Sequence, residues 1–565
     1  MGQALNLEAA WAAMSGGLKA RLALGAVGKA HLTEAARMGA AEVASLPEPD
    51  RTRVLTWCRD MLLSALADDP LDGVLARSFL AGDEQSPWLP EPARRICRLL
   101  DQHWQAPENL TYYQRLAAKR DLGRMRAYLS DRLEREAESL FWRRQAMALS
   151  VFEADFAWTR DLAALPLPSG LEAVRVKLAA DALYLSGQAE AALGLWEGLG
   201  PSFGQGWVLG RSAFARLSLG QRDQALDDFR EALALAPWQT NSLLAAFDLA
   251  TGRDTKRAEL PGSLALLLYT YNKAEDLAAT LDSLAKTDLA RADLGQARIF
   301  VLNNGCTDHT AEVLARFADR LGQLLVPVNL PVNIGAPAAR NWLMHLPAVQ
   351  AMDWALFLDD DTDLPVDLRA RLGAAVRAYP EAGVWGCKVR DFAAPTRLQS
   401  ADLHLVLPPQ ASPEQPEIDL TADEPNPFSL SDLHIQEPDL GRFDYLRPCL
   451  SVTGCCHLFR TADLPAVGDF SLFLSPTQYD DVERDLRSAK AGRAGVYQGH
   501  LAVGHRKSTG AASRTDPVAL ANALANKYKM QTMHPRSEIL ALAKWEQALL
   551  LDDVSEKARG LDRTS

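Results

Sequence analysis

Four aspartates follow an apolar run near the middle of the chain and could bind a divalent metal ion. The run WALFL (354–358) is typical of a buried strand, and Asp359, Asp360, Asp361 and Asp363 come directly after it. Asp359 and Asp361 are separated by one residue at the strand end. Such a pair of carboxylates suits Mg²⁺ or Mn²⁺, which prefer oxygen ligands and bind substrate phosphates at the same time. The alternative is a solvated acidic loop or a helix start. We favour the metal site, because a buried strand rarely ends in solvent by accident.

Other polar clusters follow other apolar runs of the same half. SLALLLYTY (263–271) leads into Asn272, and ARIFVLNN (297–304) leads into a polar turn. Helix-length segments such as AEDLAATLDSLAK and DHTAEVLARFADRLG separate these runs, so strand and helix alternate. That alternation predicts an α/β domain with a mostly parallel sheet covered by helices. Ligands of such sheets bind at the carboxyl ends of the strands, where these polar residues fall.

Four motifs in this order resemble the family 2 glycosyltransferases of the GT-A fold. They are YTYN (269–272), NNGCTD (303–308), NIGAPAARN (333–341) and FLDDDTDL (357–364). The resemblance covers residues 262–510 and implies a Rossmann-like nucleotide-diphospho-sugar transferase domain. It further implies an inverting, hexosyltransferase-type enzyme that uses a nucleotide-sugar donor with Mn²⁺ or Mg²⁺.

The resemblance assigns a donor site and a metal site. Asp361 matches the metal ligand, Asp359 faces the donor and contributes to the metal site, and His505 in GHRKS matches a histidine that meets the metal or the diphosphate. His500 is the competing histidine, and Arg506 and Lys507 could neutralise the leaving diphosphate. The nucleotide-sugar contacts expected by the same match are Thr270, Asn272, Asn303, Asp308, Asn333, Gly335, Arg340 and Asp359.

Two residues depart from the family pattern. Asn303 stands where the family has Asp, and Cys306 stands where it has Ser. An Asn carbonyl can still accept a hydrogen bond from a base N–H, but the amide also donates. The identity of the base therefore stays open, and ordinary turn chemistry is the alternative for this segment.

The acceptor half of the site is expected downstream. VTGCCHLFR (452–460) and the segment 468–492 resemble the family's acceptor-side strand and its acidic pair. Asp480 and Asp481 match that pair, with Asp481 at the position of the catalytic base and Asp480 or Glu483 orienting it or the acceptor. The alternative is a plain helix start, because acids come first in DDVERDLR and arginines later.

The N-terminal half has a different organisation. Residues 1–165 have helical apolar spacing and predict a helical bundle. GQAEAALGLW from Gly187 and GQRDQALDDF from Gly220 repeat at 33 residues, and 171–252 resembles tetratricopeptide repeats. The GT-A domain is expected at 260–512 and C-terminal helices at 513–565. The acidic, Pro-rich stretch 407–443 predicts an insertion, either a lid or a surface loop.

The composition of the chain argues against several classes of protein and of binding partner. The formal net charge of −12 argues against a nucleic-acid partner. Seven scattered cysteines without a CxxC pair argue against a disulfide framework or a zinc site and favour a cytoplasmic location. Neither a signal peptide nor a membrane span is indicated.

Two functions remain in view. The first is an active glycosyltransferase acting on a protein such as a flagellin, or on a cell-surface glycan, with the acceptor docked on the helical repeats. The second is a catalytically reduced GT-A domain that serves as an interaction scaffold. The retained carboxylates favour the enzyme. A nucleotidyltransferase would want a Gly-rich basic loop after the first strand, which YTYNKAED is not.

Overall fold

The chain folds into two compact units. The structure, a computed structural model, describes residues 5–289, 297–407, 428–506 and 517–564. The first unit, here the helical unit, comprises Met1–Thr251, Pro438–Arg442 and Val554–Ser565. The second, here the sheet unit, comprises Gly252–Glu437 and Phe443–Asp553. None of the described helices is long and apolar enough to cross a membrane.

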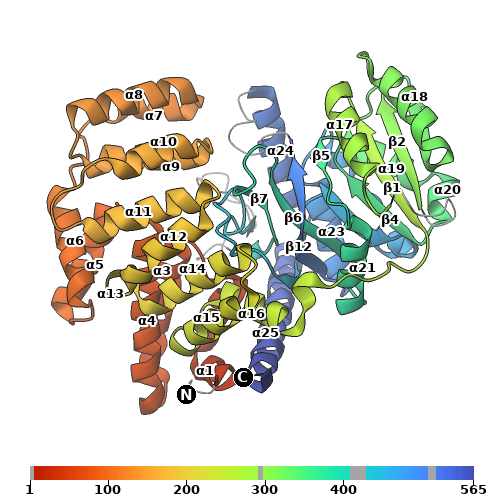
Figure 1. The fold of residues 1–565 in the computed structure, drawn as a ribbon. Coiled ribbons are helices and arrows are strands. Elements are labelled where there is room, and N and C mark those ends of the chain that lie inside the picture. The colour runs from red at the N-terminus through yellow and green to blue at the C-terminus, as the bar shows by residue number, and fades with distance from the viewer. Residues whose placement is uncertain (1–4, 290–296, 408–427, 507–516, 565) are drawn as a thin grey trace. The chain divides into compact units, whose positions relative to one another are not determined.

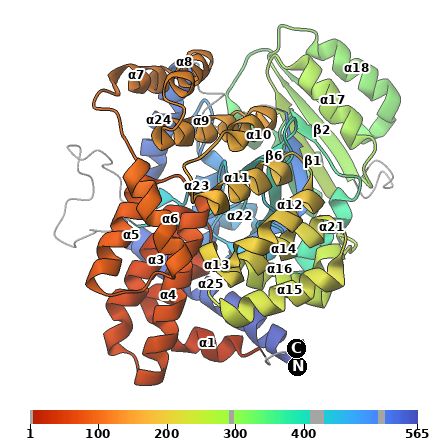
Figure 2. The same ribbon diagram turned by 60° about the vertical axis from the view of Figure 1, so that its left-hand side comes forward.

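The helical unit is a series of antiparallel helices joined by short turns (Figures 1 and 2). Its helices are α1 (Leu7–Ala13), α2 (Gly16–Leu24), α3 (Lys29–Glu42), α4 (Glu48–Asp68), α5 (Gly73–Gln85), α6 (Glu91–His103), α7 (Thr111–Lys119), α8 (Leu122–Arg135), α9 (Leu140–Phe152), α10 (Phe156–Ala164), α11 (Glu172–Leu185), α12 (Ala189–Trp196), α13 (Gly200–Phe203), α14 (Gln205–Ser218), α15 (Arg222–Leu235) and α16 (Thr240–Thr251). The predicted helical character of this half is confirmed.

The repeated glycines lie at equivalent turns. Gly187 separates α11 from α12, and Gly220 separates α14 from α15. Their φ angles are 80° and 76°, a left-handed conformation that glycine adopts without strain. Ala192 and Ala225, five residues after each glycine, have no exposed surface, so each pair of helices packs closely there. The assignment to tetratricopeptide repeats stays a prediction.

The sheet unit is built on a ten-stranded mixed sheet in the order β10-β12-β6-β11-β4-β1-β2-β3, with β5 paired to β12 and β7 to β6. The strands are β1 (Leu264–Thr270), β2 (Ala297–Asn304), β3 (Leu325–Leu330), β4 (Trp354–Leu358), β5 (Thr362–Asp363), β6 (Val384–Asp391), β7 (Leu398–Ser400), β8 (Leu405–Val406), β9 (Ser429–Leu430), β10 (Leu446–Cys449), β11 (Cys456–Arg460) and β12 (Gly495–His505). Strands β1 to β4 are parallel, whereas β11 runs antiparallel to β4 and β6. The predicted α/β class is confirmed, with a mixed sheet.

Helices cover both faces of this sheet. They are α17 (Ala274–Leu284), α18 (Thr310–Leu321), α19 (Ala336–Met344), α20 (Pro347–Gln350), α21 (Leu368–Ala378), α22 (Leu464–Val467), α23 (Asp480–Lys490), α24 (Pro517–Thr532) and α25 (Arg536–Thr564), the last of which ends in the helical unit.

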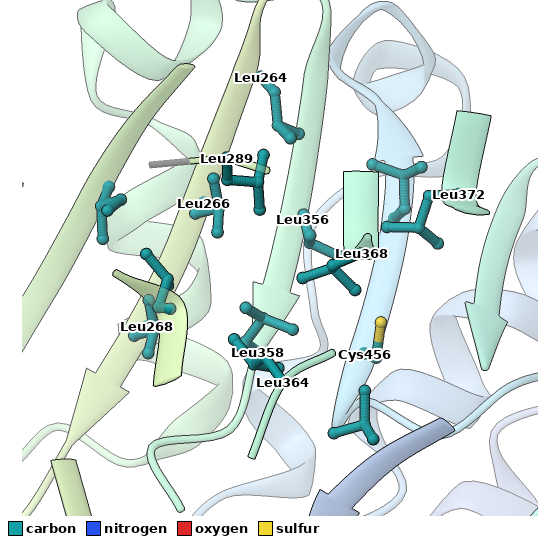
Figure 3. Close-up of a cluster of buried hydrophobic side chains, with 14 of the residues drawn as sticks. Leu264, Leu266, Leu268, Leu289, Leu356, Leu358, Leu364, Leu368, Leu372 and Cys456 are labelled. Carbon is teal, nitrogen blue, oxygen red and sulfur yellow. The ribbon is translucent and has the colours of Figure 1, made fainter. Parts of the chain in front are cut away.

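Alternate residues of the central strands face opposite layers. Leu264, Leu266 and Leu268 of β1 pack with α17, α18 and α21, as Figure 3 shows in part, and Ala265 and Leu267 pack toward α19. Every residue of β4 is buried, as the unbroken apolar run predicts. The core thus fixes the strand ends where the polar motifs lie.

The stretch 407–443 lies mostly outside the described residues, since 408–427 are not placed. Its described part contains β9, which pairs with β8. A lid role for this stretch stays a prediction.

Candidate active site

The carboxyl ends of β1, β2 and β4 lie side by side at one edge of the sheet. Thr270 at the end of β1 is the register partner of Asn303 at the end of β2. The acidic run follows β4, the other neighbour of β1. The sheet therefore brings together the donor-side motifs that are separated in the sequence.

The three adjacent aspartates have different surroundings. The Asp361 side chain is 1% exposed and the Asp359 side chain 30% exposed. Asp360 is buried, and Thr280 donates to its backbone carbonyl at 3.0 Å. Asp359 thus faces the solvent side of the edge, and Asp361 is held inside it.

His505 is brought to Asp361 by strand pairing. β12 runs antiparallel to β5, with His505 opposite Thr362. The Nε2 atom of His505 lies 2.8 Å from Asp361 Oδ1 and 3.6 Å from Asp359 Oδ2. His505, rather than His500, is therefore the histidine beside the acidic run.

These residues fit a divalent cation. The Nδ1 atom of His505 lies 2.9 Å from Gln399 Oε1, so an Nδ1–H donated there leaves the Nε2 lone pair directed at the carboxylates, as in metal-ligating histidines. Asp361 Oδ1 is buried and makes no hydrogen bond, although Nε2 is 2.8 Å away. Two ligand atoms of one octahedral ion stand at about this separation, since the bonds are about 2.1 Å. The two atoms are therefore close enough to bind one and the same ion.

Cys455 also faces this point. One ligand atom each of Asp359, Cys455 and His505 lie within 4.8 Å of one another. Burial raises the pKa of the Cys455 thiol well above its usual value, and the neighbouring Asp359 carboxylate adds to the rise. A thiol is a soft ligand and therefore matches the hard ions Mg²⁺ and Mn²⁺ poorly.

Lys273 neutralises the acidic run. Its Nζ donates to Asp360 Oδ1 at 2.8 Å and to Asp361 Oδ2 at 2.9 Å. Burial alone would lower the pKa of Lys273, but the two carboxylates outweigh it and hold the pKa above its usual value. The lysine thus stabilises two adjacent carboxylates that would otherwise repel each other.

Asn272 and Asn303, two of the predicted nucleotide-sugar contacts, hold the turn that follows β2. Asn303 Oδ1 accepts from the Cys306 N–H at 2.9 Å, and its amide donates to Asn329 Oδ1 at 3.1 Å. Asn272 has φ 53° and accepts from the Thr307 N–H at 2.7 Å. The turn chemistry named as the alternative is therefore present in the structure.

Asp308, Asn333 and Gly335 shape the neighbouring loops. Asp308 accepts from the Ala274 N–H at 3.1 Å and from the Thr310 N–H at 3.1 Å. It thereby connects the starts of α17 and α18. Asn333 accepts from the Gly335 N–H at 2.9 Å, and Gly335 has φ 81° just before α19. These residues give the donor edge its backbone shape.

Arg340 and Asp480 form a buried ion pair. Arg340 Nη1 lies 2.8 Å from Asp480 Oδ2, and the two side chains are 6% and 3% exposed. The guanidinium lies 5.0 Å from the Phe470 ring centroid and 5.6 Å from that of Tyr269. This pair connects α19, on the donor side, to the first turn of α23.

Asp481 is the more accessible member of the acidic pair. It lies in the first turn of α23, and its Oδ2 accepts from the Gly454 N–H at 2.6 Å. A Cβ on Gly454 would lie 2.8 Å from Asp481 Oδ2 and 2.6 Å from Arg340 Nη2. Glycine at 454 therefore lets this backbone approach both side chains. Glu483 is buried and pairs with Arg487, so it is turned to another partner.

Residues 266–445 match the family model of glycosyl transferase family 2. The predicted GT-A-like α/β fold is confirmed, and the match supports the prediction of a nucleotide-sugar glycosyltransferase. The match includes the acidic run and ends before Asp480, Asp481 and His505. No curated protein matches the chain.

Solved glycosyltransferases are similar at low identity. GalNAc-T7 with UDP, GalNAc and Mn²⁺ is 12% identical, with 44% of each chain covered and a TM-score of 0.34. The mannosyltransferase PcManGT from Pyrobaculum calidifontis, in complex with GDP-Man and Mn²⁺, is 16% identical, with 60% of this chain and 85% of that chain covered and a TM-score of 0.34. S. aureus TarS is 18% identical, with 45% of this chain and 38% of that chain covered and a TM-score of 0.28. The chain thus spans less than half the length of the GalNAc-T7 and TarS chains.

Three residues that contact the predicted site residues were not predicted from the sequence. Lys273 directly follows the YTYN motif, and its positive charge could have indicated a partner for the aspartates. Gln399 and Gly454 carry no local signal, because their partners His505 and Asp481 lie far along the chain. Of the predicted diphosphate contacts, Arg506 Nη2 lies 3.4 Å from Asp363 Oδ1, and Lys507 falls outside the described residues.

Proposed function

We propose that the sheet unit is an inverting, metal-dependent glycosyltransferase that moves a sugar from a nucleotide-sugar donor to an acceptor hydroxyl. The observation that carries the proposal is the arrangement of Asp361 and His505, two ligand atoms 2.8 Å apart without a hydrogen bond, beside the accessible Asp359. A metal ion held there would stand at the carboxyl edge of the sheet, where α/β domains bind nucleotides.

On the donor side, Asp361 and His505 would hold the divalent ion, with Asp359 as a further oxygen donor. The ion supplies positive charge to a diphosphate leaving group. Lys273 favours the ionised forms of Asp360 and Asp361 and holds both side chains in place. Thr270 and the turn around Asn303 form the floor for the nucleotide, and Asn303 has one carbonyl lone pair beyond the Cys306 N–H for a base N–H.

On the acceptor side, Asp481 would act as the general base. Its Oδ2 is fixed by the Gly454 N–H, so the carboxylate is oriented before the acceptor binds. As the acceptor oxygen attacks the anomeric carbon, its proton passes to Asp481, and the bond from that carbon to the diphosphate breaks. The nucleoside diphosphate leaves from the opposite face, which inverts the anomeric configuration.

We assign Arg340 and Asp480 a positioning role. Their ion pair is almost fully buried, so neither side chain is free to meet substrate. Because Asp480 precedes Asp481, anchoring it through Arg340 fixes the first turn of α23 relative to α19. This refines the earlier expectation that Arg340 lines the base.

The proposal for the acceptor depends only on the domain organisation of the chain. Helical repeats joined to a transferase suggest a protein acceptor, such as a flagellin, or a cell-surface glycan docked on the repeats. The alternative, a catalytically reduced scaffold, is disfavoured because Asp361, Asp481 and His505 are all present and gathered at one edge of the sheet.

A donor panel tests the proposal. The full chain is incubated with a set of UDP-, GDP- and dTDP-sugars with Mn²⁺ or Mg²⁺, and the released nucleotide is measured. We expect metal-dependent release from at least one donor, and Asp361→Asn is the matched negative control. Absence of both turnover and metal-dependent binding for every donor would favour the scaffold.

A further inference from the structure

A second cluster of histidine and carboxylate side chains lies in the sheet unit, away from the acidic run. Asp402, His404 and His434 are each at most 1% exposed. His404 Nε2 lies 2.8 Å from Asp402 Oδ2, and His434 Nδ1 lies 2.8 Å from Asp402 Oδ1. One ligand atom from each of the three residues lies within 4.8 Å of the others. Two imidazoles and one carboxylate therefore converge in a dry interior.

The second ring nitrogen of His404, Nδ1, contacts another carboxylate. His404 Nδ1 lies 2.9 Å from Glu546 Oε1, and Glu546 Oε2 accepts from the Leu405 N–H at 3.0 Å. Metal-ligating histidines commonly donate their second N–H to a carboxylate, which fixes the tautomer and turns the other nitrogen to the ion. Glu546 stands in that relation to His404.

His434 provides the second observation. Its side chain is 1% exposed, and neither ring nitrogen makes a hydrogen bond. The 2.8 Å approach of Nδ1 to Asp402 Oδ1 thus lacks hydrogen-bond geometry. A buried imidazole nitrogen that lacks a well-aligned hydrogen bond is costly, because it loses water and gains little in return. An ion between the imidazoles and Asp402 would give His434 Nδ1 a ligand bond in place of that contact.

We propose that Asp402, His404 and His434 bind a structural zinc ion. Nitrogen and carboxylate ligands suit this borderline ion, with bonds of about 2.0–2.2 Å. Tyr445, whose hydroxyl donates to Asp402 Oδ1 at 2.8 Å, or a water molecule completes the coordination. The site joins the two chain segments on either side of residues 408–427 to α25. Cysteine counting could not reveal it, because no cysteine is a ligand.

The competing explanation is a metal-free ion network. His404 can be doubly protonated between Asp402 and Glu546, with Arg447 Nη1 3.7 Å from Asp402 Oδ2 supplying further positive charge. That network satisfies His404 and Asp402 but leaves His434 Nδ1 in a poorly aligned contact with Asp402 Oδ1. The two explanations differ in metal content, which can be measured.

The test is elemental analysis of the full chain, purified without immobilised metal and dialysed against EDTA. All proteins carry Asp361→Asn, so that the donor site contributes no ion. We expect about one zinc ion per chain, resistant to EDTA because the site is buried. His434→Asn in this background should lower zinc to background, and His345→Asn, which removes an exposed histidine paired with Asp469, should not.

A second measurement covers the case in which His434→Asn fails to fold. The Asp361→Asn protein is unfolded, stripped of metal and refolded with Co²⁺ in place of zinc. We expect visible d–d absorption at about one ion per chain and a higher unfolding temperature than after refolding without metal. A folded, stable protein that holds no zinc and takes up no Co²⁺ would overturn the proposal in favour of the ion network.

Discussion

The sheet unit contains two clusters in which a histidine nitrogen meets an aspartate oxygen at 2.8 Å, and their contact with solvent differs sharply. In the first, His505 faces Asp361, and the neighbouring Asp359 is 30% exposed. In the second, His404 and His434 face Asp402, whose side chain is fully buried. We propose that the first, being accessible, binds an exchangeable ion for catalysis, and that the second, being buried, holds a structural ion.

The largest effect on transfer is expected from Asp361→Asn. The amide keeps the shape but loses the charge that holds the ion, and the loss of metal-supplied charge stabilisation corresponds to roughly 10³-fold in the rate of transfer. The measurement is nucleotide release at saturating donor. Asp363→Asn is the matched control, because the Asp363 side chain is 45% exposed and pairs with Arg506 rather than with His505 or Lys273. Equal losses of transfer in both variants would show that transfer depends on the overall negative charge of the loop and not on Asp361 in particular.

Asp481→Asn should separate chemistry from donor binding. Without a base for the acceptor proton, we expect transfer to fall by about 10²-fold or more. Donor affinity, measured by calorimetry with the nucleotide sugar and Mn²⁺, should stay unchanged. The control is Asp469→Asn on an exposed aspartate of the same region. A large loss of donor affinity in Asp481→Asn would contradict its assignment as the base.

A smaller effect, on stability, is expected from Lys273→Met. The substitution leaves the buried carboxylates of Asp360 and Asp361 without their shared cation, which costs about 2 kcal/mol after allowance for the lysine's partial exposure. Saturating Mn²⁺ should restore most of that free energy of unfolding, because the ion supplies the missing charge. Urea unfolding with and without Mn²⁺ measures both, with Lys286→Met as the control. A loss that Mn²⁺ leaves untouched would show that no ion binds beside these carboxylates.

The sequence predicts the donor edge well, because its signals are local. The run WALFL followed by aspartates is both a buried strand and a strand end, and β4 is found at 354–358. The edge strand β3 gave no such signal. This strand contains Pro327, and partly buried residues alternate with exposed residues along it. It therefore lacks the continuous apolar pattern of a central strand.

Long-range pairs could not be predicted in this way. Arg340 and Asp480 are 140 residues apart, and the sequence predicted that Arg340 contacts the nucleotide sugar and that Asp480 orients Asp481 or the acceptor, not that the two pair. His404 and Glu546 are 142 residues apart, and neither lies in a motif. Such pairs depend on the order of the strands and on the path of α25, which local apolar spacing does not encode.

The most direct test of the central claim is the dependence of transfer on added metal. Wild-type protein is treated with EDTA and desalted, and nucleotide release from its best donor is measured against increasing Mn²⁺. We predict release at background without Mn²⁺ and full recovery on its addition, while the zinc bound at Asp402, His404 and His434 stays constant. Full transfer by the EDTA-treated protein without added metal would contradict the assignment of Asp361 and His505 as the site of an exchangeable catalytic ion.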